Sequence, residues 1–478
     1  MTITIVGLGP GSINQLTLEA WRVLDEAGEV YLRTARHPMI KDLPQNTTYH
    51  SFDGLYDDAE SFEALYQAIA EQIVAKGEVV YAVPGHPFVA EKTTSLIIKL
   101  AKVRGIPVKI VEGLSFIEPT LTILGIDGVE GLQIHDALEI GAMYHPPLNP
   151  DQPAIIAQVY SRAVASDLKL TLMNQYTDEF EVVLVHGAGT PDAELERVPL
   201  YEIDRSEKIA HLTSLYIPPM PQLSSFQALL EVTAHLRAPE GCPWDQEQTH
   251  ESLRRYLLEE AHEVLEAIDK GDMDSLAEEL GDLTSQILLH TQIAVDDGEF
   301  YVTDVMHNIV EKLIRRHPHV WGDVDVENSD DVVKNWEAIK AEEKNNKEQR
   351  ESVLDGIPSG LPALIRATRL QERAARVGFD WAEIGPVIEK IREELDEIEQ
   401  AVDDEERAKE FGDLLFAIVN WTRWLALDAE SLLRETNLRF YQRFRYIETQ
   451  ATKQGRSMTN MTLDEMDALW DAAKENGL

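Results

Sequence analysis

The stretch Glu-Glu-Ala-His-Glu at residues 259–263, followed by Glu-Leu-Gly-Asp at 279–282, decides how the C-terminal half of this chain folds. The same order returns as Glu-Glu-Leu-Asp-Glu at 393–397 and Glu-Phe-Gly-Asp at 410–413. On an α-helix, residues three or four positions apart share a face, so each stretch gathers several carboxylates. Apolar residues flank both copies, which predicts that these helices are partly buried. Crowded, half-buried carboxylates repel one another, and protonation or a cation relieves that repulsion.

Divalent metal binding is the interpretation that we favour for both acidic stretches. Hard cations such as Mg²⁺ prefer oxygen ligands. The alternative is a solvated acidic face, but two copies at similar spacing are harder to obtain by chance. The sequence therefore predicts a metal-dependent enzyme acting on phosphates. The candidate metal ligands are Glu259, Glu260, Glu263, Glu279 and Asp282 in the first copy, and Glu393, Glu394, Glu397, Glu410 and Asp413 in the second.

The charge balance excludes several classes of partner. The 478 residues include 85 acidic and 43 basic side chains, a formal net charge of −42. Such a field repels polynucleotides and anionic membranes, so we expect neither a nucleic-acid polymer nor a membrane as a partner. A single cysteine, Cys242, excludes a disulfide framework and fits a reducing compartment. Without a signal-peptide pattern or a long apolar run, the expected location is the cytoplasm.

The chain changes character near residue 217. Before it, short β-branched runs such as 3–6, 79–83 and 154–159 alternate with helical patterns, which predicts an α/β domain over 1–217. After a proline-rich linker, helical periodicity predicts two all-α domains, 223–345 and 363–478. Residues 340–362, first charged and then rich in proline and glycine, are expected to form an exposed connector.

Further motifs repeat in the two helical domains. A basic pair at spacing four follows each acidic stretch: Lys312 with Arg316, then Arg439 with Arg443. Arginine can clamp a phosphate through two parallel hydrogen bonds, although surface pairing with the many acids is the simpler alternative. A tryptophan precedes each acidic stretch and is expected either to pack in the core or to stack on a base. These tryptophans are Trp244 and Trp381.

These motifs resemble the signature of MazG-type nucleoside triphosphate pyrophosphohydrolases over residues 223–478. The resemblance rests on EEAHE…ELGD, EELDE…EFGD, GCPWDQEQTHESL, RRHPHVWGD, VGFDW and NLRFYQRFRYIE. It implies Mg²⁺-dependent hydrolysis of an NTP or dNTP to the nucleoside monophosphate and pyrophosphate. It also implies pairing of such domains into helical bundles, and we expect a homodimer through the helical half.

The resemblance favours the second helical domain as the catalytic one. Asn437 is a polar residue of the kind found near the nucleotide, whereas the first domain has Val310 at the matching position. Three roles remain open for the first helical domain: it is active, regulatory or mainly a dimerisation unit. A carboxylate that binds no metal would orient the attacking water or take its proton. The catalytic candidates are Glu394, Glu397, Asn437, Arg439 and Arg443.

Glycines follow the first expected strand in Gly7-Leu-Gly-Pro-Gly11. With the segments 81–91, 111–119 and 182–191, this loop resembles the tetrapyrrole (corrin/porphyrin) methylase family, which binds S-adenosylmethionine between two α/β subdomains. His86 stands where that family usually has an aspartate, and Phe116 where it has a second serine. The cofactor candidates are Gly7, Gly9, Pro10, Gly11, Gly85 and Ser115.

Three functions follow from these expectations. The leading one is a nucleotide pyrophosphohydrolase with a domain resembling the S-adenosylmethionine-binding methylases, in the order found in YabN-type bacterial fusions. A methyltransferase with accessory helical domains and a non-catalytic scaffold are the alternatives. The altered second glycine loop disfavours the methyltransferase, and two complete acidic quintets disfavour the scaffold.

Overall fold

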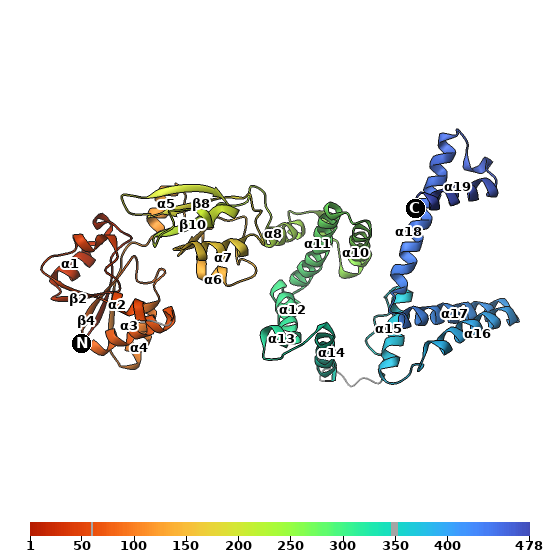
Figure 1. Ribbon diagram of the computed structural model, residues 1–478, viewed down its shortest axis with the longest axis horizontal. Helices are drawn as coiled ribbons and strands as arrows, with labels where there is room; N and C mark the ends of the chain where they lie inside the picture. Colours follow the sequence, from red (N-terminus) through yellow and green to blue (C-terminus); the bar gives the residue numbers. More distant parts are fainter. Residues whose placement is uncertain (59–60, 346–351) are drawn as a thin grey trace. The chain divides into compact units, whose positions relative to one another are not determined.

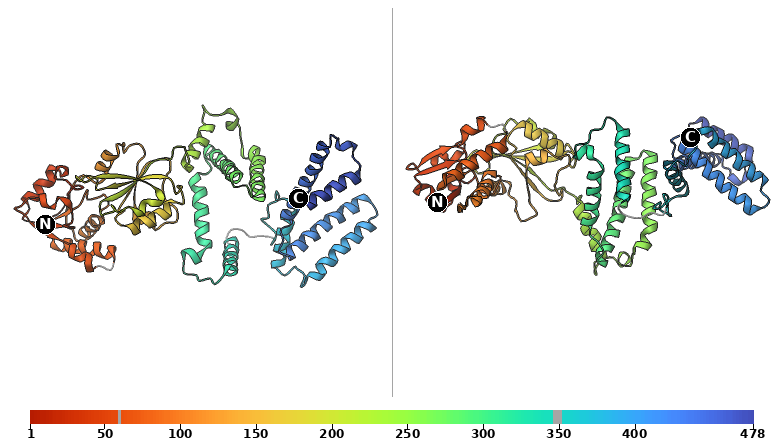
Figure 2. Two further views of the ribbon diagram at one scale, coloured as in Figure 1. Left: turned by 45° about the horizontal axis from the view of Figure 1, so that its top comes forward. Right: turned by 90° about the horizontal axis from the view of Figure 1, so that it is seen from below.

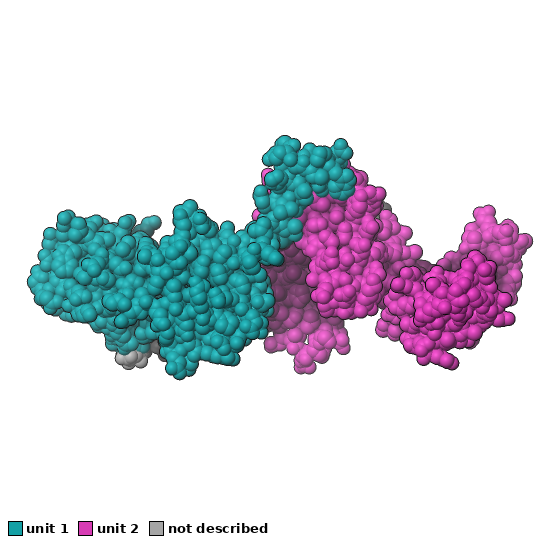
Figure 3. Space-filling view, turned by 90° about the horizontal axis from the view of Figure 1, so that it is seen from above, with its two compact units in different colours: residues 1–247 teal, residues 248–478 magenta. Residues whose placement is uncertain are grey.

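The structure is a computed structural model that describes residues 1–58, 61–345 and 352–478. It divides into two compact units, residues 1–247 and 248–478 (Figure 3). The first unit contains two β-sheets with covering helices, and the second is helical (Figure 1). The expected change from an α/β to an all-α architecture is therefore confirmed.

The first sheet is entirely parallel, with strand order β3-β2-β4-β1-β5. Its central strands β1 and β4 are mostly buried on both faces, as parallel strands covered by helices require. Ile3 and Ile5 of β1 pack on one side with α3 and α4, whereas Val6 packs on the other side with α1. The elements are β1 (Ile3–Gly7), α1 (Leu18–Glu26), β2 (Glu29–Leu32), β3 (Thr48–Ser51), α2 (Asp53–Asp58), α3 (Phe62–Lys76), β4 (Val79–Val83), α4 (Lys92–Val103) and β5 (Val108–Val111).

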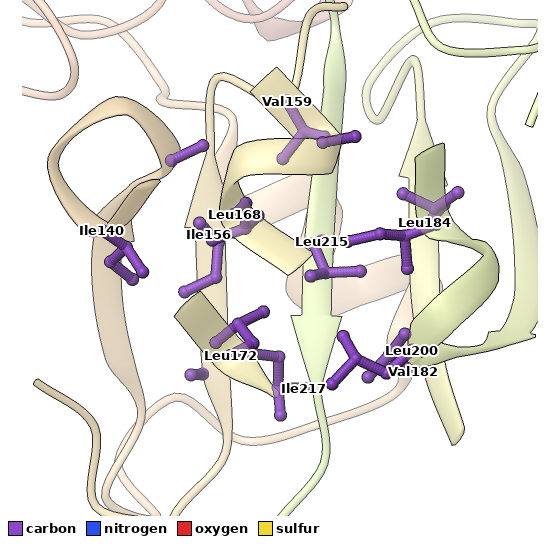
Figure 4. Close-up of a cluster of buried hydrophobic side chains, with 14 of the residues drawn as sticks. Ile140, Ile156, Val159, Leu168, Leu172, Val182, Leu184, Leu200, Leu215 and Ile217 are labelled. Carbon is purple, nitrogen blue, oxygen red and sulfur yellow. The ribbon is translucent and has the colours of Figure 1, made fainter. Parts of the chain in front are cut away.

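The second sheet is mixed, with strand order β6-β7-β10-β8-β9 and one parallel pair, β6 with β7. Its core gathers strand residues such as Ile156 and Leu215 against Leu168 and Leu172 of α7 (Figure 4). β7 ends at Ala157, earlier than expected, because Gln158 has a φ of 64°. The elements are α5 (Ile117–Leu124), β6 (Gln133–Asp136), α6 (Ala137–Gly141), β7 (Ala154–Ala157), α7 (Arg162–Leu172), β8 (Glu181–His186), β9 (Glu194–Pro199) and β10 (Thr213–Ile217).

The helices α8 (Phe226–Arg237) and α9 (Pro243–Gln246) complete the first unit. In the second unit, long helices follow one another in pairs joined by short turns (Figure 2). The elements are α10 (His250–Lys270), α11 (Met273–Asp297), α12 (Val302–Arg316), α13 (Pro318–Trp321), α14 (Ser329–Asn345), α15 (Ala363–Arg376), α16 (Ile384–Gln400), α17 (Asp404–Trp424), α18 (Ala429–Lys453) and α19 (Leu463–Glu475).

Local sequence signals define the two helix pairs that carry the acidic stretches. α10 ends at Gly271, whose φ of 66° lets the chain turn, and Asp272 caps the N-terminus of α11. Asp403 caps α17 in the same way. The connector expected at 340–362 begins later, because α14 continues to Asn345. Residues 346–351 of that connector lie outside the described residues.

Among the helices of the described residues, none combines the length and the apolar character that a membrane span needs.

Candidate active site

The α16–α17 pair brings three carboxylates together, which we call the second acidic cluster. Glu394 comes from α16, and Glu410 and Asp413 come from α17. One carboxylate oxygen of each lies within 4.8 Å of the others. This spacing suits oxygen ligands around one hard cation, for which metal–oxygen distances are about 2.0–2.6 Å.

Glu394 is the buried member of this cluster, with 3% of its surface exposed. Its Oε1 lies 2.8 Å from Nζ of Lys390, one helical turn earlier. Its Oε2 is also buried, and it has no hydrogen-bond partner among the described residues. Burying a charged oxygen without a partner is costly, and Glu410 and Asp413 place two further carboxylates nearby, so this group of residues is a candidate site for a cation.

Glu397 and Glu393 stand at the edge of the second acidic cluster. Burial raises the pKa of Glu410, and the neighbouring charges of Glu397, Asp413 and Glu394 raise it further. Glu397 therefore belongs to the same electrostatic site, although its side chain is exposed. Glu393 forms a salt bridge with Lys390, in which Oε1 of Glu393 lies 3.1 Å from Nζ of Lys390.

The α10–α11 pair forms the first acidic cluster from Glu260, Glu263 and Glu279, whose oxygens also lie within 4.8 Å of one another. Burial raises the pKa of Glu260, and Asp282 and Glu263 add to the effect. Burial and the charge of Glu263 also raise the pKa of Glu279. Glu259 is exposed and lies outside the cluster of three.

The second acidic cluster has a lysine side chain beside it, Lys390, which the first cluster lacks and which the sequence analysis did not single out. Lys390 stands three residues before Glu393, and the matching position of the first repeat holds Tyr256. Hydrogen bonding to Glu394, together with Glu393, raises the pKa of Lys390 despite its burial. The second cluster therefore contains a built-in ammonium group beside its carboxylates.

A cavity of about 540 Å³ opens beside Lys390 and Glu393. Its lining also includes Trp381, which is 42% exposed. The second of the two tryptophans singled out in the sequence thus lines a cavity at the acidic cluster rather than a closed core. The lining residues are Trp381, Gly385, Pro386, Glu389, Lys390 and Glu393.

Among the described residues, neither Arg439 nor Arg443 of α18 forms an ion pair with a carboxylate of the acidic clusters, and Arg439 instead lies 3.7 Å from Oε2 of Glu435. Arg439 donates a hydrogen bond of 2.8 Å to Oγ1 of Thr436. Arg443 donates one of 2.7 Å to the carbonyl oxygen of Leu478, and its guanidinium lies 5.5 Å from the ring centre of Trp470. Asn437 is exposed on the same helix.

In the first repeat, Arg316 is already engaged by a carboxylate. Its Nη2 lies 2.6 Å from Oε2 of Glu343 on α14, and both side chains are mostly buried. Hydrogen bonds from Arg316 and Arg315 lower the pKa of Glu343 to about 2, although burial opposes the shift. Sequence reasoning did not predict this pair, because its two members are 27 residues apart along the chain.

In the first unit, three glycines at strand ends meet in one place. A Cβ on Gly7 would lie 2.7 Å from the carbonyl oxygen of Gly85 and 2.8 Å from the nitrogen of Gly113. The amide of Gly85 donates to the carbonyl of Gly9 at 2.9 Å, and the amide of Gly9 donates to the carbonyl of Gly85 at 3.2 Å. Only glycine permits this approach, so the expected loops do come together.

The other cofactor candidates lie against the same loops. A Cβ on Gly11 would lie 2.8 Å from Cγ2 of Thr190, which brings the 182–191 segment to the first loop. Ser115 is 2% exposed, and its Oγ donates to Oε2 of Glu118 at 2.6 Å. The hydroxyl of Ser115 is thus committed to an internal carboxylate.

The chain thus joins an α/β domain with converging glycine loops to helix pairs that carry acidic clusters. The family model of tetrapyrrole (corrin/porphyrin) methylases matches residues 2–204, and that of the MazG nucleotide pyrophosphohydrolase domain matches residues 248–321. The chain belongs to the family that joins these two kinds of domain. It is 44% identical to the uncharacterized protein YabN of Bacillus subtilis (strain 168), across 99% of this chain and 98% of that protein.

Two further relatives cover the MazG part. The nucleoside triphosphate pyrophosphohydrolase/pyrophosphatase MazG of Thermotoga maritima is 46% identical, over 52% of this chain and 95% of that protein. The nucleoside triphosphate pyrophosphohydrolase of Escherichia coli (strain K12) is 45% identical, over 53% of this chain and 98% of that protein.

Proposed function

We propose that the helical unit hydrolyses nucleoside triphosphates to nucleoside monophosphates and pyrophosphate. The observation that carries the proposal is the clustering of Glu394, Glu410 and Asp413, together with the buried Oε2 of Glu394, which has no hydrogen-bond partner among the described residues. The names of the Thermotoga and Escherichia relatives support the same reaction.

The second acidic cluster fits Mg²⁺, because it offers only oxygen ligands and one of them is buried without a partner. Bound there, the ion would neutralise phosphate charge and lower the pKa of a water molecule. Glu394, Glu410 and Asp413 would hold it. Glu397, exposed at the edge, would orient the attacking water and accept its proton.

Lys390 is proposed to bind a phosphate of the substrate. Its ammonium group lines the cavity beside the second acidic cluster, so an entering triphosphate meets a positive charge in a strongly acidic chain. Exchanging the contact with Glu393 for a contact with phosphate would leave the contact with Glu394 in place. Trp381, on the same cavity, is proposed to contact the base.

A homodimer is proposed through the helical unit. Phe411, Leu415 and Ile418 lie on one face of α17 and are 51%, 57% and 38% exposed. An isologous dimer would cover this face in both copies. It would also provide a second chain for Asn437, Arg439 and Arg443 of α18, which we propose to contact the nucleotide.

The first acidic cluster is proposed to bind metal without supporting the main activity. Glu259, Glu260, Glu263, Glu279 and Asp282 are its proposed ligands. It lacks the lysine of the second cluster, and Arg316 is held by Glu343. Val310, where the second repeat has Asn437, is 53% exposed.

The first domain is proposed to bind S-adenosylmethionine as a regulatory ligand. The meeting of loops 7–11, 85 and 187–190 and the match to the methylase family support this proposal. The proposed domain limits are 1–217, 223–345 and 363–478, and the proposed location is the cytoplasm.

Release of pyrophosphate from a panel of NTPs and dNTPs tests the proposed function. We expect release with Mg²⁺ and none after chelation, and a change in rate on adding S-adenosylmethionine if that ligand is regulatory. Absence of pyrophosphate from the whole panel would contradict the proposed hydrolysis, whereas release of orthophosphate alone would assign a different bond.

A further inference from the structure

The second unit contains a cavity of about 400 Å³ whose lining is basic. Among the described residues of its lining, four side chains are cationic and one, Glu372, is a carboxylate. This composition is the reverse of the whole chain, which has almost two acidic residues for each basic one. The cations are Lys340 of α14 and Arg369, Arg373 and Arg376 of α15.

The arginines share one face because of their spacing on α15. Arg369, Arg373 and Arg376 follow one another at intervals of four and three residues, which places them on one face of a helix. The opposite side of α15 packs on α17, where Nε2 of Gln371 donates a hydrogen bond of 2.8 Å to the carbonyl oxygen of Phe416. The basic face is therefore presented away from the acidic helix pair by the packing of α15.

Contacts with the main chain order this basic face. The guanidinium of Arg373 donates to the carbonyl oxygens of Val353, Asp355 and Gly356. These contacts fix the arginine beside the 356–361 turn, which forms another wall of the cavity. Arg369 pairs with Glu372 at 2.9 Å, so the one lining carboxylate has a defined partner.

Trp336 forms the wall on the α14 side. Nζ of Lys340 lies 4.4 Å from its ring centre, and the guanidinium of Arg316 lies 5.4 Å from it. Cation–π contacts of this kind hold a lysine near the aromatic face and limit its motion. The ammonium group of Lys340 is thereby kept at the cavity.

We propose that this cavity binds a polyphosphate anion, either free pyrophosphate or the phosphates of a nucleotide. Arginine matches phosphate geometry with two parallel hydrogen bonds, and a concave site in which cations outnumber carboxylates attracts anions. The cavity is wide enough for a chain of two or three phosphates beside Trp336. The acidic clusters need a metal to receive such an anion, whereas this cavity needs none.

Binding of inorganic pyrophosphate to the full chain in EDTA tests the proposal, measured by isothermal titration calorimetry. EDTA removes the divalent metal that the acidic clusters would need to bind pyrophosphate, so the result does not depend on the proposed hydrolysis. We expect one pyrophosphate per chain, with an affinity that falls as salt rises. The double variant Lys340→Ala/Arg376→Ala should bind at least about tenfold more weakly, which corresponds to about 1.4 kcal/mol.

Arg22→Ala is the matched control, because it removes an exposed arginine from α1 in the other unit. It should bind pyrophosphate as the unaltered chain does. The double variant should retain its helical circular dichroism and its Mg²⁺-dependent pyrophosphate release. Equal affinity of the double variant and the unaltered chain, or no binding of pyrophosphate in EDTA, would overturn the proposal.

Titration with ATP in EDTA identifies the source of the phosphates. Tighter binding of ATP than of pyrophosphate, with the difference removed by Trp336→Ala, would assign the site to nucleotides. Equal affinities would assign it to free polyphosphate. Binding of ATP without any binding of pyrophosphate would contradict the phosphate-based site proposed above.

Discussion

Nζ of Lys390 lies 2.8 Å from Oε1 of Glu394, while the other oxygen of the same carboxylate is buried and has no hydrogen-bond partner within the described parts of the chain. One oxygen of Glu394 is thus paired within the chain, and a carboxylate oxygen of Glu394 lies within 4.8 Å of those of Glu410 and Asp413. A lysine can neutralise one charge of the cluster, but it cannot replace a divalent ion among three carboxylates. This division is the basis for proposing separate places for a cation and for a phosphate at the second acidic cluster.

Replacing Lys390 with methionine should make the fold more dependent on metal. In EDTA the variant should unfold more easily by about 2 kcal/mol, because Glu394 then lacks any partner while buried. Excess Mg²⁺ should remove most of this difference. Thermal unfolding with and without Mg²⁺ measures it, and Arg392→Met, which removes an exposed pair with Glu389, should change little. Equal sensitivity of the two variants to EDTA would contradict the role given to Lys390.

Metal removal should destabilise the helical unit in a pH-dependent way. The pKa values of Glu410, Glu260 and Glu279 are raised in the fold, so the folded state binds protons more tightly than the unfolded chain. Without metal, their favourable contribution is complete below the ordinary glutamate pKa and is lost as the pH rises through the raised values. The gap in melting temperature between Mg²⁺ and EDTA samples should therefore widen from about pH 4.5 to 7. A gap that stays constant over this range would mean that the acidic groups are solvated.

The N-terminal α/β domain should become less stable as the pH falls, because His37 must then be protonated while it is buried. Burial lowers the pKa of His37 from 6.5 to about 4, and the nearby carbonyls of Gly9 and Pro10 offset only part of this effect. Neither ring nitrogen has a hydrogen-bond partner of ordinary geometry among the described residues. Since the folded state resists protonation, stability present above pH 6.5 should fall by about 3 kcal/mol as the pH drops to 4.

Urea unfolding of the unaltered chain and of His37→Leu across this pH range measures that loss. His37→Leu should not show this pH-dependent loss in the free energy of unfolding. His211→Leu, at an exposed position, should still show it. A His37→Leu chain with the same pH profile as the unaltered one would exclude His37 as the cause.

The proposed dimer should dissociate when a charge enters the apolar face of α17. Leu415→Glu places a carboxylate at the centre of the face formed by Phe411, Leu415 and Ile418, where burial would cost several kcal/mol per dimer. Light scattering of the full chain should report a dimer that becomes a monomer in this variant. Val402→Glu, in the exposed turn between α16 and α17, is the control and should remain dimeric. A monomeric unaltered chain would contradict the dimer itself.

Periodicity and spacing were sufficient to predict the architecture. The β-branched runs at 3–6, 79–83 and 108–111 became neighbouring strands of one sheet, because their pattern is continuous and local. The gathering of Glu394, Glu410 and Asp413 also followed from helical spacing and a short turn. Local geometry determines both features, so a sequence suffices for them.

The partners of the charged residues could not be predicted in the same way. Lys390 is four residues before Glu394, a signal that the sequence did contain, but such pairs are frequent on acidic helices. The pairing of Arg316 with Glu343 depends on how α12 and α14 pack, which no local pattern encodes. The commitment of Ser115 to Glu118 likewise depends on a side-chain orientation.

The central claim is that the second acidic cluster carries the hydrolysis, and paired substitutions test it most directly. Pyrophosphate release from the best substrate of the panel should be measured for Glu394→Gln and for Glu260→Gln, its counterpart in the first repeat, with Glu397→Gln and Glu263→Gln as a second pair. We expect the rate of pyrophosphate release to fall by about a hundredfold, equivalent to about 3 kcal/mol, in Glu394→Gln and in Glu397→Gln. In Glu260→Gln and Glu263→Gln the same rate should fall by less than about threefold. Full activity of Glu394→Gln, or loss confined to Glu260→Gln and Glu263→Gln, would contradict the assignment to the second repeat.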